Sequence, residues 1–238
     1  MSKKKKQRYE RRPAFRHPKK SFLIVVEGKT EEEYFKKYKN DSRSNLIDVI
    51  VDNPPCTDPV NLVNRAMELK RQKDSDAKKS EFVVPYDERG VWVVYDLEKM
   101  HDARRTLSIV VQEKVKNNKI ELAVSDPAFE LWYILHFKKT TKSFNDADET
   151  EKYLKAILKK EKIWPDYQKA TTPPQEIYDR TNTAITNAKW VRNQLNTTGD
   201  TAPKTDVDLL VEELRDANCP QPPAQANSTG DKSPRKHS

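Results

Sequence analysis

Carboxylates follow two apolar runs of the sequence at the point where each run ends. Glu27 comes directly after the run at residues 22–26, and Asp96-Leu97-Glu98 comes after the run at residues 91–95. Side chains two positions apart in an extended chain point the same way, so Asp96 and Glu98 should face together. In an open parallel sheet, ligands bind outside the carboxyl ends of the strands. The three carboxylates therefore converge on one site if the two runs form neighbouring strands.

Three carboxylates without nearby Cys or His ligands suit a hard cation, Mg²⁺ or Mn²⁺, rather than zinc. Because Mg²⁺ usually binds substrate phosphate oxygens as well, the natural substrate is a phosphodiester. The metal would stabilise charge on the phosphoryl oxygens and lower the pKa of a bound water, leaving a carboxylate to act as general base or acid. Lys29, close to Glu27, could offset the phosphate charge. Each motif alone also fits ordinary structure, since Glu is favoured at a helix N-terminus and Asp-x-Glu occurs in loops.

Further polar residues lie near these motifs. Glu130 belongs to an apolar segment, residues 128–137, that reads as a buried helix. A buried carboxylate needs a metal ion, a structural hydrogen bond or a basic side chain, and the sequence leaves these alternatives open. His101 and Asp102 follow the Asp-Leu-Glu motif and could reach the site as extra ligands or supporting residues, although a solvated helix start is the simpler explanation. His136, among aromatic neighbours, is interpreted as a core histidine.

Four short apolar runs alternate with segments of helical character. This βα alternation predicts an α/β fold with a mostly parallel sheet flanked by helices. The first and third runs are apolar almost throughout, as expected for central strands covered on both faces. The predicted strands are residues 22–26, 46–51, 91–95 and 120–124.

Helix signals separate and follow these runs. The first helix should begin near Thr30, with Glu33 three positions on as in a capping box, and the second should be capped by Thr57 or Asp58. Residues 82–85 are predicted as a short edge strand, because their proline argues against a central one. Further helices are predicted at residues 99–118, 146–161, 174–195 and 205–215.

The formal net charge of +8 is concentrated at the N-terminus. Residues 1–20 hold ten basic residues and one acidic residue, which leaves 35 basic and 36 acidic residues in the rest of the chain. Such a leader is expected to be disordered and to attract polyanions such as nucleic acid, with strong salt dependence. A solvated leader without a partner explains the same composition. The predicted nucleic-acid contacts in it are Lys3, Lys4, Lys5, Lys6, Arg8, Arg11 and Arg12.

The composition argues against several classes of protein. Cys56 and Cys219 are far apart and have no Cys-x-x-Cys partner, so neither a disulfide framework nor a zinc site is expected. No stretch approaches the roughly 18 apolar residues that span a bilayer, and the leader lacks the apolar core of a signal peptide. With four glycines and no glycine-rich phosphate loop, a P-loop or dinucleotide-binding site is disfavoured. We expect a cytoplasmic protein without membrane contact.

A chain of 238 residues is expected to hold one core domain with appendages. The predicted organisation is a disordered basic leader, an α/β core, a helical C-terminal portion packed on that core, and a disordered tail rich in Pro, Gln, Ser and Asn. These units are assigned to residues 1–20, 21–145, 146–216 and 217–238, respectively.

Several of these motifs together resemble the RloB-like family, found among prokaryotic restriction and phage-defence genes. The likeness is carried by the strand before Glu27-Gly28, by the tryptophan-bearing strand before Asp96-Leu97-Glu98, and by residues 125–137. Residues 205–214 are similar to the family's closing helix, and the likeness covers roughly residues 20–215. Its most specific part is the Pro-x-Phe-Glu-Leu-Trp pattern.

The resemblance implies a TOPRIM-like fold, shared with topoisomerases, primases and OLD-type nucleases. It gives Glu27 the role of general acid/base and gives Asp96 with Glu98 the binding of Mg²⁺, although Glu98 stands where a second Asp is usual. It also implies a metal-dependent endonuclease that cleaves DNA or RNA, tRNA included, in anti-phage defence. An ATPase or another defence subunit is the partner to look for, and a homo-oligomer is compatible with the sequence.

Two other functions stay open. One is a non-catalytic subunit that binds nucleic acid or a partner protein and keeps its carboxylates for structure. The other is a nucleotidyl or phosphoryl transferase that uses the same site on a small nucleotide.

Overall fold

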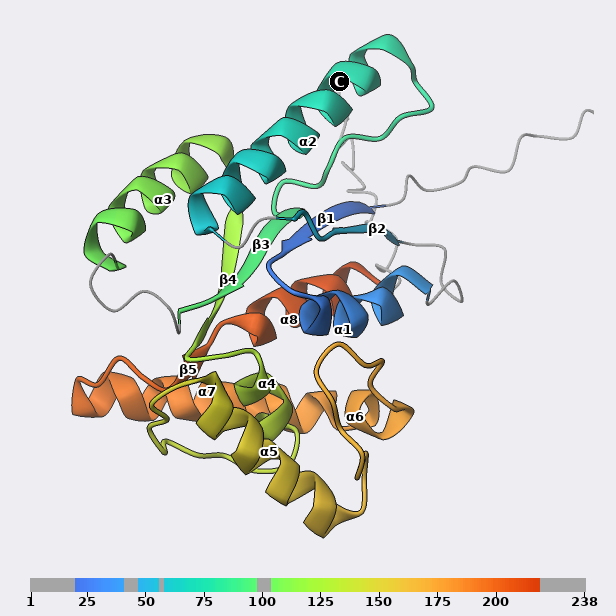
Figure 1. The fold of residues 1–238 in the computed structure, drawn as a ribbon. Coiled ribbons are helices and arrows are strands. Elements are labelled where there is room, and N and C mark those ends of the chain that lie inside the picture. Colours follow the sequence, from blue (N-terminus) through green and yellow to red (C-terminus); the bar gives the residue numbers. More distant parts are fainter. Residues whose placement is uncertain (1–19, 41–46, 56–57, 98–103, 219–238) are drawn as a thin grey trace, which may run out of the picture.

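A computed structural model of the chain describes residues 20–40, 47–55, 58–97 and 104–218. These residues form an α/β fold built on a five-stranded sheet in the order β2-β1-β3-β4-β5 (Figure 1). The first four strands in this order run parallel, and β5 is antiparallel to β4. The strands are β1 (Lys20–Val26), β2 (Ile47–Asp52), β3 (Val91–Asp96), β4 (Glu121–Asp126) and β5 (Lys204–Thr205).

The predicted mostly parallel sheet is confirmed, and the two most apolar runs form central strands. β1 lies between β2 and β3, and β3 lies between β1 and β4. β1 is buried from its second residue to its last, because the sheet is covered on both faces. Alternate side chains enter opposite cores, with Phe22 and Ile24 on one face and Leu23 and Val25 on the other.

The helices of the α/β core follow the strands as predicted. The helix expected near Thr30 begins one residue earlier. Asp58 caps the next helix, because its Oδ1 accepts hydrogen bonds from the backbone N–H groups of Val60 and Asn61. These helices are α1 (Lys29–Asn40), α2 (Pro59–Lys79), α3 (Arg104–Asn118) and α4 (Glu130–Leu135).

A group of C-terminal helices packs on the same face of the sheet as α1 and α4, whereas α2 and α3 cover the other face (Figure 1). The single helix predicted at residues 174–195 is two helices, because the chain leaves the helical conformation at Arg180 (φ −92°, ψ 7°). There the Thr181 hydroxyl donates to the Tyr178 carbonyl oxygen. The C-terminal helices are α5 (Ala147–Glu161), α6 (Gln175–Asp179), α7 (Thr181–Thr198) and α8 (Val207–Ala217).

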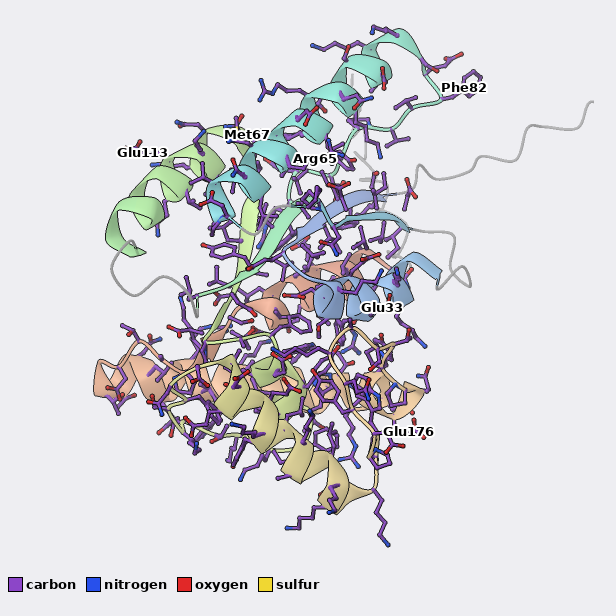
Figure 2. All side chains as sticks on the ribbon, in the orientation of Figure 1. Glu33, Arg65, Met67, Phe82, Glu113 and Glu176 are labelled. Carbon is purple, nitrogen blue, oxygen red and sulfur yellow. The ribbon has the colours of Figure 1, made fainter. Side chains whose placement is uncertain are left out.

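Three local predictions are wrong. Residues 82–85 form no strand, because the chain after α2 runs beyond the sheet and leaves Phe82 89% exposed at the far end of that helix (Figure 2). Thr205 does not start the last helix but belongs to β5. The capping box of Thr30 and Glu33 does not form, because Thr30 already lies inside the first turn and its hydroxyl accepts a hydrogen bond from Ala170 N–H.

Candidate functional site

The ends of β1 and β3 bring two of the predicted carboxylates together. The strands pair in parallel with Val26 opposite Val94, so Glu27 and Asp96 leave the sheet at the same edge. The Glu27 N–H donates to the Val94 carbonyl oxygen at 3.0 Å. The Asp96 N–H donates to Glu27 Oε2, also at 3.0 Å. A direct hydrogen bond therefore joins the two strand ends.

A cavity of about 320 Å³ opens beside these two residues. Its wall comes from the β1–α1 turn, the first turn of α1, the end of β3, the start of α4, the first residue of α5 and the loop between α5 and α6. Parts of the chain that are far apart in sequence thus contribute to one acidic pocket. The carboxylates that line it are Glu27, Glu31, Asp96 and Glu130.

Glu31 is a pocket residue that sequence reasoning misses, because it stands among three consecutive glutamates. It is the third residue of α1 and is 4% exposed. A Cβ atom on Gly28 would lie 2.7 Å from Glu31 Oε2, so the glycine leaves room for this carboxylate. The signal in the sequence is the spacing, since a Glu at the third helical position can reach back toward the residue before the helix.

Glu130, predicted to be buried, is 2% exposed at the first position of α4. The Tyr167 hydroxyl donates to Glu130 Oε1 at 3.0 Å, and Lys169 Nζ lies 3.6 Å from the same oxygen. Glu130 therefore accepts a hydrogen bond, pairs with a basic side chain and also lines the cavity.

Negative charge in this pocket is energetically unfavourable. Burial raises the pKa of Asp96 well above its usual value, and the neighbouring Glu31, Glu130 and Glu27 raise it further. Burial likewise raises the pKa of Glu31 to about 7. It also raises the pKa of Glu130, although Lys169 acts in the opposite direction. The charged forms are disfavoured until a proton or a cation compensates them.

The donor atoms of the pocket suit a hard divalent cation, although they do not form a coordination sphere as they stand. In the described part of the chain, no three Asp, Glu, His or Cys side chains are placed so that they could hold a metal ion together. The acidic donors are nevertheless all carboxylates, and Asp96 Oδ1 is buried without a hydrogen-bond partner. Oxygen donors of this kind are those that Mg²⁺ and Mn²⁺ prefer.

Two lysines are among the residues that line the pocket. Lys29 Nζ lies 2.9 Å from Glu32 Oε2 and 3.5 Å from Glu33 Oε1, and its side chain is half exposed. Lys29, predicted to offset phosphate charge, is therefore paired with two glutamates outside the set of pocket carboxylates. The second lysine, Lys169, forms an ion pair with the pocket carboxylate Glu130 and was not found from the sequence.

His136 lies in the core, as predicted. It is fully buried, and its Nδ1 lies 2.8 Å from the Trp132 carbonyl oxygen. Three other predicted site residues, Glu98, His101 and Asp102, lie outside the described residues, and so do the predicted nucleic-acid contacts of the basic leader. Among the helices that are described, none combines the length and the apolar character needed to cross a bilayer.

Comparison with known families agrees with the resemblance seen in the sequence. A model of the family described as RloB-like protein matches residues 22–214. Searches of curated proteins and of solved structures gave no match. The matched range extends from β1 into α8 and includes all four pocket carboxylates.

Proposed function

The chain belongs to the RloB-like family, and we propose that it is a metal-dependent nuclease that cleaves DNA or RNA, tRNA included, in a prokaryotic anti-phage defence system. We propose with it that the parallel sheet is a TOPRIM-like fold and that the cofactor is Mg²⁺ or Mn²⁺. The observation that carries this proposal is the hydrogen bond between Asp96 and Glu27 at adjacent strand ends, beside a cavity lined by four carboxylates.

Glu27 is the residue that would move the proton. The Asp96 N–H holds Glu27 Oε2, which fixes this carboxylate at the edge of the cavity. Water attacks the phosphorus atom, the bond from phosphorus to one sugar oxygen breaks, and Glu27 transfers a proton from the attacking water to the leaving oxygen. A bound metal would stabilise the charge on the phosphoryl oxygens. Asp96, Glu31 and Glu130 would hold it, with Glu98 as a further predicted ligand.

A non-catalytic subunit that binds nucleic acid or a partner protein is the competing function. The observation that favours it is the absence, within the described residues, of three side chains already placed to hold a metal ion. In that case the pocket carboxylates would keep protons or pair with Lys169 rather than bind a cation.

Metal titration separates these two functions. Isothermal titration of Mg²⁺ and of Mn²⁺ into the wild-type protein should show binding at millimolar concentrations or tighter. Asp96→Asn should weaken that binding at least about tenfold, because it removes the pocket carboxylate whose Oδ1 is buried without a hydrogen-bond partner. Thermal unfolding of the variant should show an intact fold, since the substitution removes a charge that burial disfavours.

Glu32→Gln is the matched control for this titration. It also removes one acidic charge beside the pocket, where Glu32 pairs with Lys29 and Lys36 without lining the cavity. This variant should bind both ions as the wild type does. A wild type that binds neither ion, or an Asp96→Asn variant that binds them equally well, would favour the non-catalytic subunit.

A further inference from the structure

The loop between α5 and α6 closes one side of the carboxylate pocket, and Figure 1 shows it reaching from α5 to α1. Lys162, Trp164 and Ala170 in this loop have left-handed backbone conformations, with φ of 56°, 54° and 64°. Residues other than glycine rarely adopt this conformation, and they keep it where the surrounding structure holds them. Tertiary contacts therefore define the path of the loop.

Three hydrogen bonds join the loop to the elements that carry the carboxylates. Two of them flank Lys169 in the sequence, so the backbone of Lys169 is held beside the cavity that its side chain lines. The bonds run from the Tyr167 hydroxyl to Glu130 Oε1 (3.0 Å), from Ala170 N–H to Thr30 Oγ1 (3.1 Å) and from the Thr172 hydroxyl to Glu33 Oε2 (2.7 Å).

The Lys169 ammonium lies between the cavity and solvent. Its Nζ is 3.6 Å from Glu130 Oε1 and 3.8 Å from Glu151 Oε2, and the side chain is 44% exposed. Lys169 is therefore placed to meet a ligand that enters the pocket from solvent.

We propose that Lys169 is a substrate-binding residue whose ammonium contacts a phosphate of the bound nucleic acid. This inference rests on the proposed nuclease function and deepens it, because it names a basic side chain that contacts the phosphate of the substrate. A cavity lined by four carboxylates repels a phosphodiester, and a positive charge at its wall reduces that repulsion. The helical C-terminal portion would then complete a site whose carboxylates all come from the α/β core.

Cleavage of plasmid DNA and of bulk tRNA in single-turnover assays with Mg²⁺ tests this role. Lys169→Met should lower the rate about 10- to 100-fold, the size of effect expected for one charge-assisted contact. Lys169→Arg should restore most of the rate, because it keeps the charge. Lys155→Met is the matched control, since Lys155 also pairs with Glu151 and is 49% exposed but does not line the cavity. It should stay within about twofold of the wild type.

Binding gives a second measurement that does not require cleavage. With Ca²⁺ in place of Mg²⁺, the Kd for the same plasmid DNA and tRNA is measured at several salt concentrations. For Lys169→Met the slope of log Kd against log salt should fall by about one, because one phosphate contact is lost. The slope for Lys155→Met should equal that of the wild type. Mg²⁺ should bind Lys169→Met at least as tightly as the wild type, because Lys169 holds the substrate and not the metal.

The outcomes separate this inference from the proposed function. An unchanged rate together with an unchanged salt slope in Lys169→Met would overturn the inference, and so would equal slope changes in both lysine variants. Loss of cleavage together with loss of Mg²⁺ binding would also overturn it, because Lys169 would then act on the metal site. A wild type that cleaves neither polymer would overturn the proposed function, and the salt slopes would still decide whether Lys169 contacts phosphate.

Discussion

Carboxylates crowd together in this pocket at an energetic cost that a ligand can remove. Burial is the main reason why the pKa values of Asp96 and Glu31 are raised, and repulsion between neighbouring carboxylates adds to it. Asp96 Oδ1 has no hydrogen-bond partner that would offset this cost. A divalent cation would offset burial and repulsion together, because its charge is the largest in such a site.

His136 shows how burial acts on a base. Its imidazole is fully buried, with the rings of Tyr34 and Trp132 packed around it. Burial lowers the pKa of His136 to about 4, and the nearby Arg180 also disfavours the charged form. The folded protein therefore keeps this histidine neutral under conditions in which the unfolded chain would protonate it.

We predict that His136 makes the fold less stable in acid. The unfolded chain binds a proton at this residue near pH 6.5 and the folded chain only near pH 4. The contribution to the free energy of unfolding is therefore complete above about pH 6.5 and falls by about 3 kcal/mol as the pH approaches 4. Urea unfolding from pH 7.5 to pH 4 should show a steeper decline for the wild type than for His136→Asn. Parallel curves would contradict the assignment.

Residues at strand ends could be predicted from the sequence, and residues placed by tertiary contacts could not. Glu27 and Asp96 follow apolar runs whose ends are visible in the sequence, so their meeting at one edge could be inferred. Glu31 lies in the pocket beside Gly28, at a place where a Cβ atom on residue 28 would meet its carboxylate. Lys169 lies on a loop whose path depends on contacts with α1 and α4. No local sequence pattern identifies Lys169 as a pocket residue.

At the scale of elements, the shortest strand links the helical C-terminal portion to the sheet. β5 pairs with the end of β4, where Ser125 Oγ lies 3.1 Å from Thr205 Oγ1. Helix α8 follows at once, and its fully buried Asp208 accepts a hydrogen bond from Arg192 Nη2 of α7 at 2.7 Å. This ion pair connects the two helices beside β5.

We predict that Arg192→Met lowers the free energy of unfolding by about 2 kcal/mol or more, because it leaves the Asp208 carboxylate buried without its partner. Chemical denaturation measures the change, and adding Asp208→Asn to the variant should recover part of the loss. Lys189→Met is the matched control, since it removes an exposed ion pair between the same two helices, to Glu212, and should cost at most about 1 kcal/mol. Equal losses in the two single variants would contradict this prediction.

The elements that the sequence predicts well are those with a long, regular pattern. The four apolar runs predicted the four parallel strands that the structure contains. The charged helices α2 and α5 have clear N-caps at Asp58 and Asp146. β5 has two residues and exists only because β4 lies beside it, so no periodicity could reveal it. The break at Arg180 likewise interrupts a helical pattern that continues on both sides.

At the scale of the whole molecule, the candidate site lies where the α/β core meets the helical C-terminal portion. The core supplies the four carboxylates at the carboxyl edge of its sheet, and the loop between α5 and α6 supplies Lys169. Residues 1–20 account for the net positive charge of the chain, and we expect them to attract polyanions in addition to whatever the site itself binds. We therefore expect the proposed cleavage to need both portions in place.

Single-turnover cleavage of plasmid DNA and of tRNA by Glu27→Gln tests the central claim most directly. The substitution keeps the size of the side chain but cannot carry a proton, so the rate should fall at least about 100-fold while Mg²⁺ binding and thermal unfolding stay close to those of the wild type. Glu32→Gln, the control in the same segment, should cleave normally. A Glu27→Gln variant that cleaves at the wild-type rate would contradict the account.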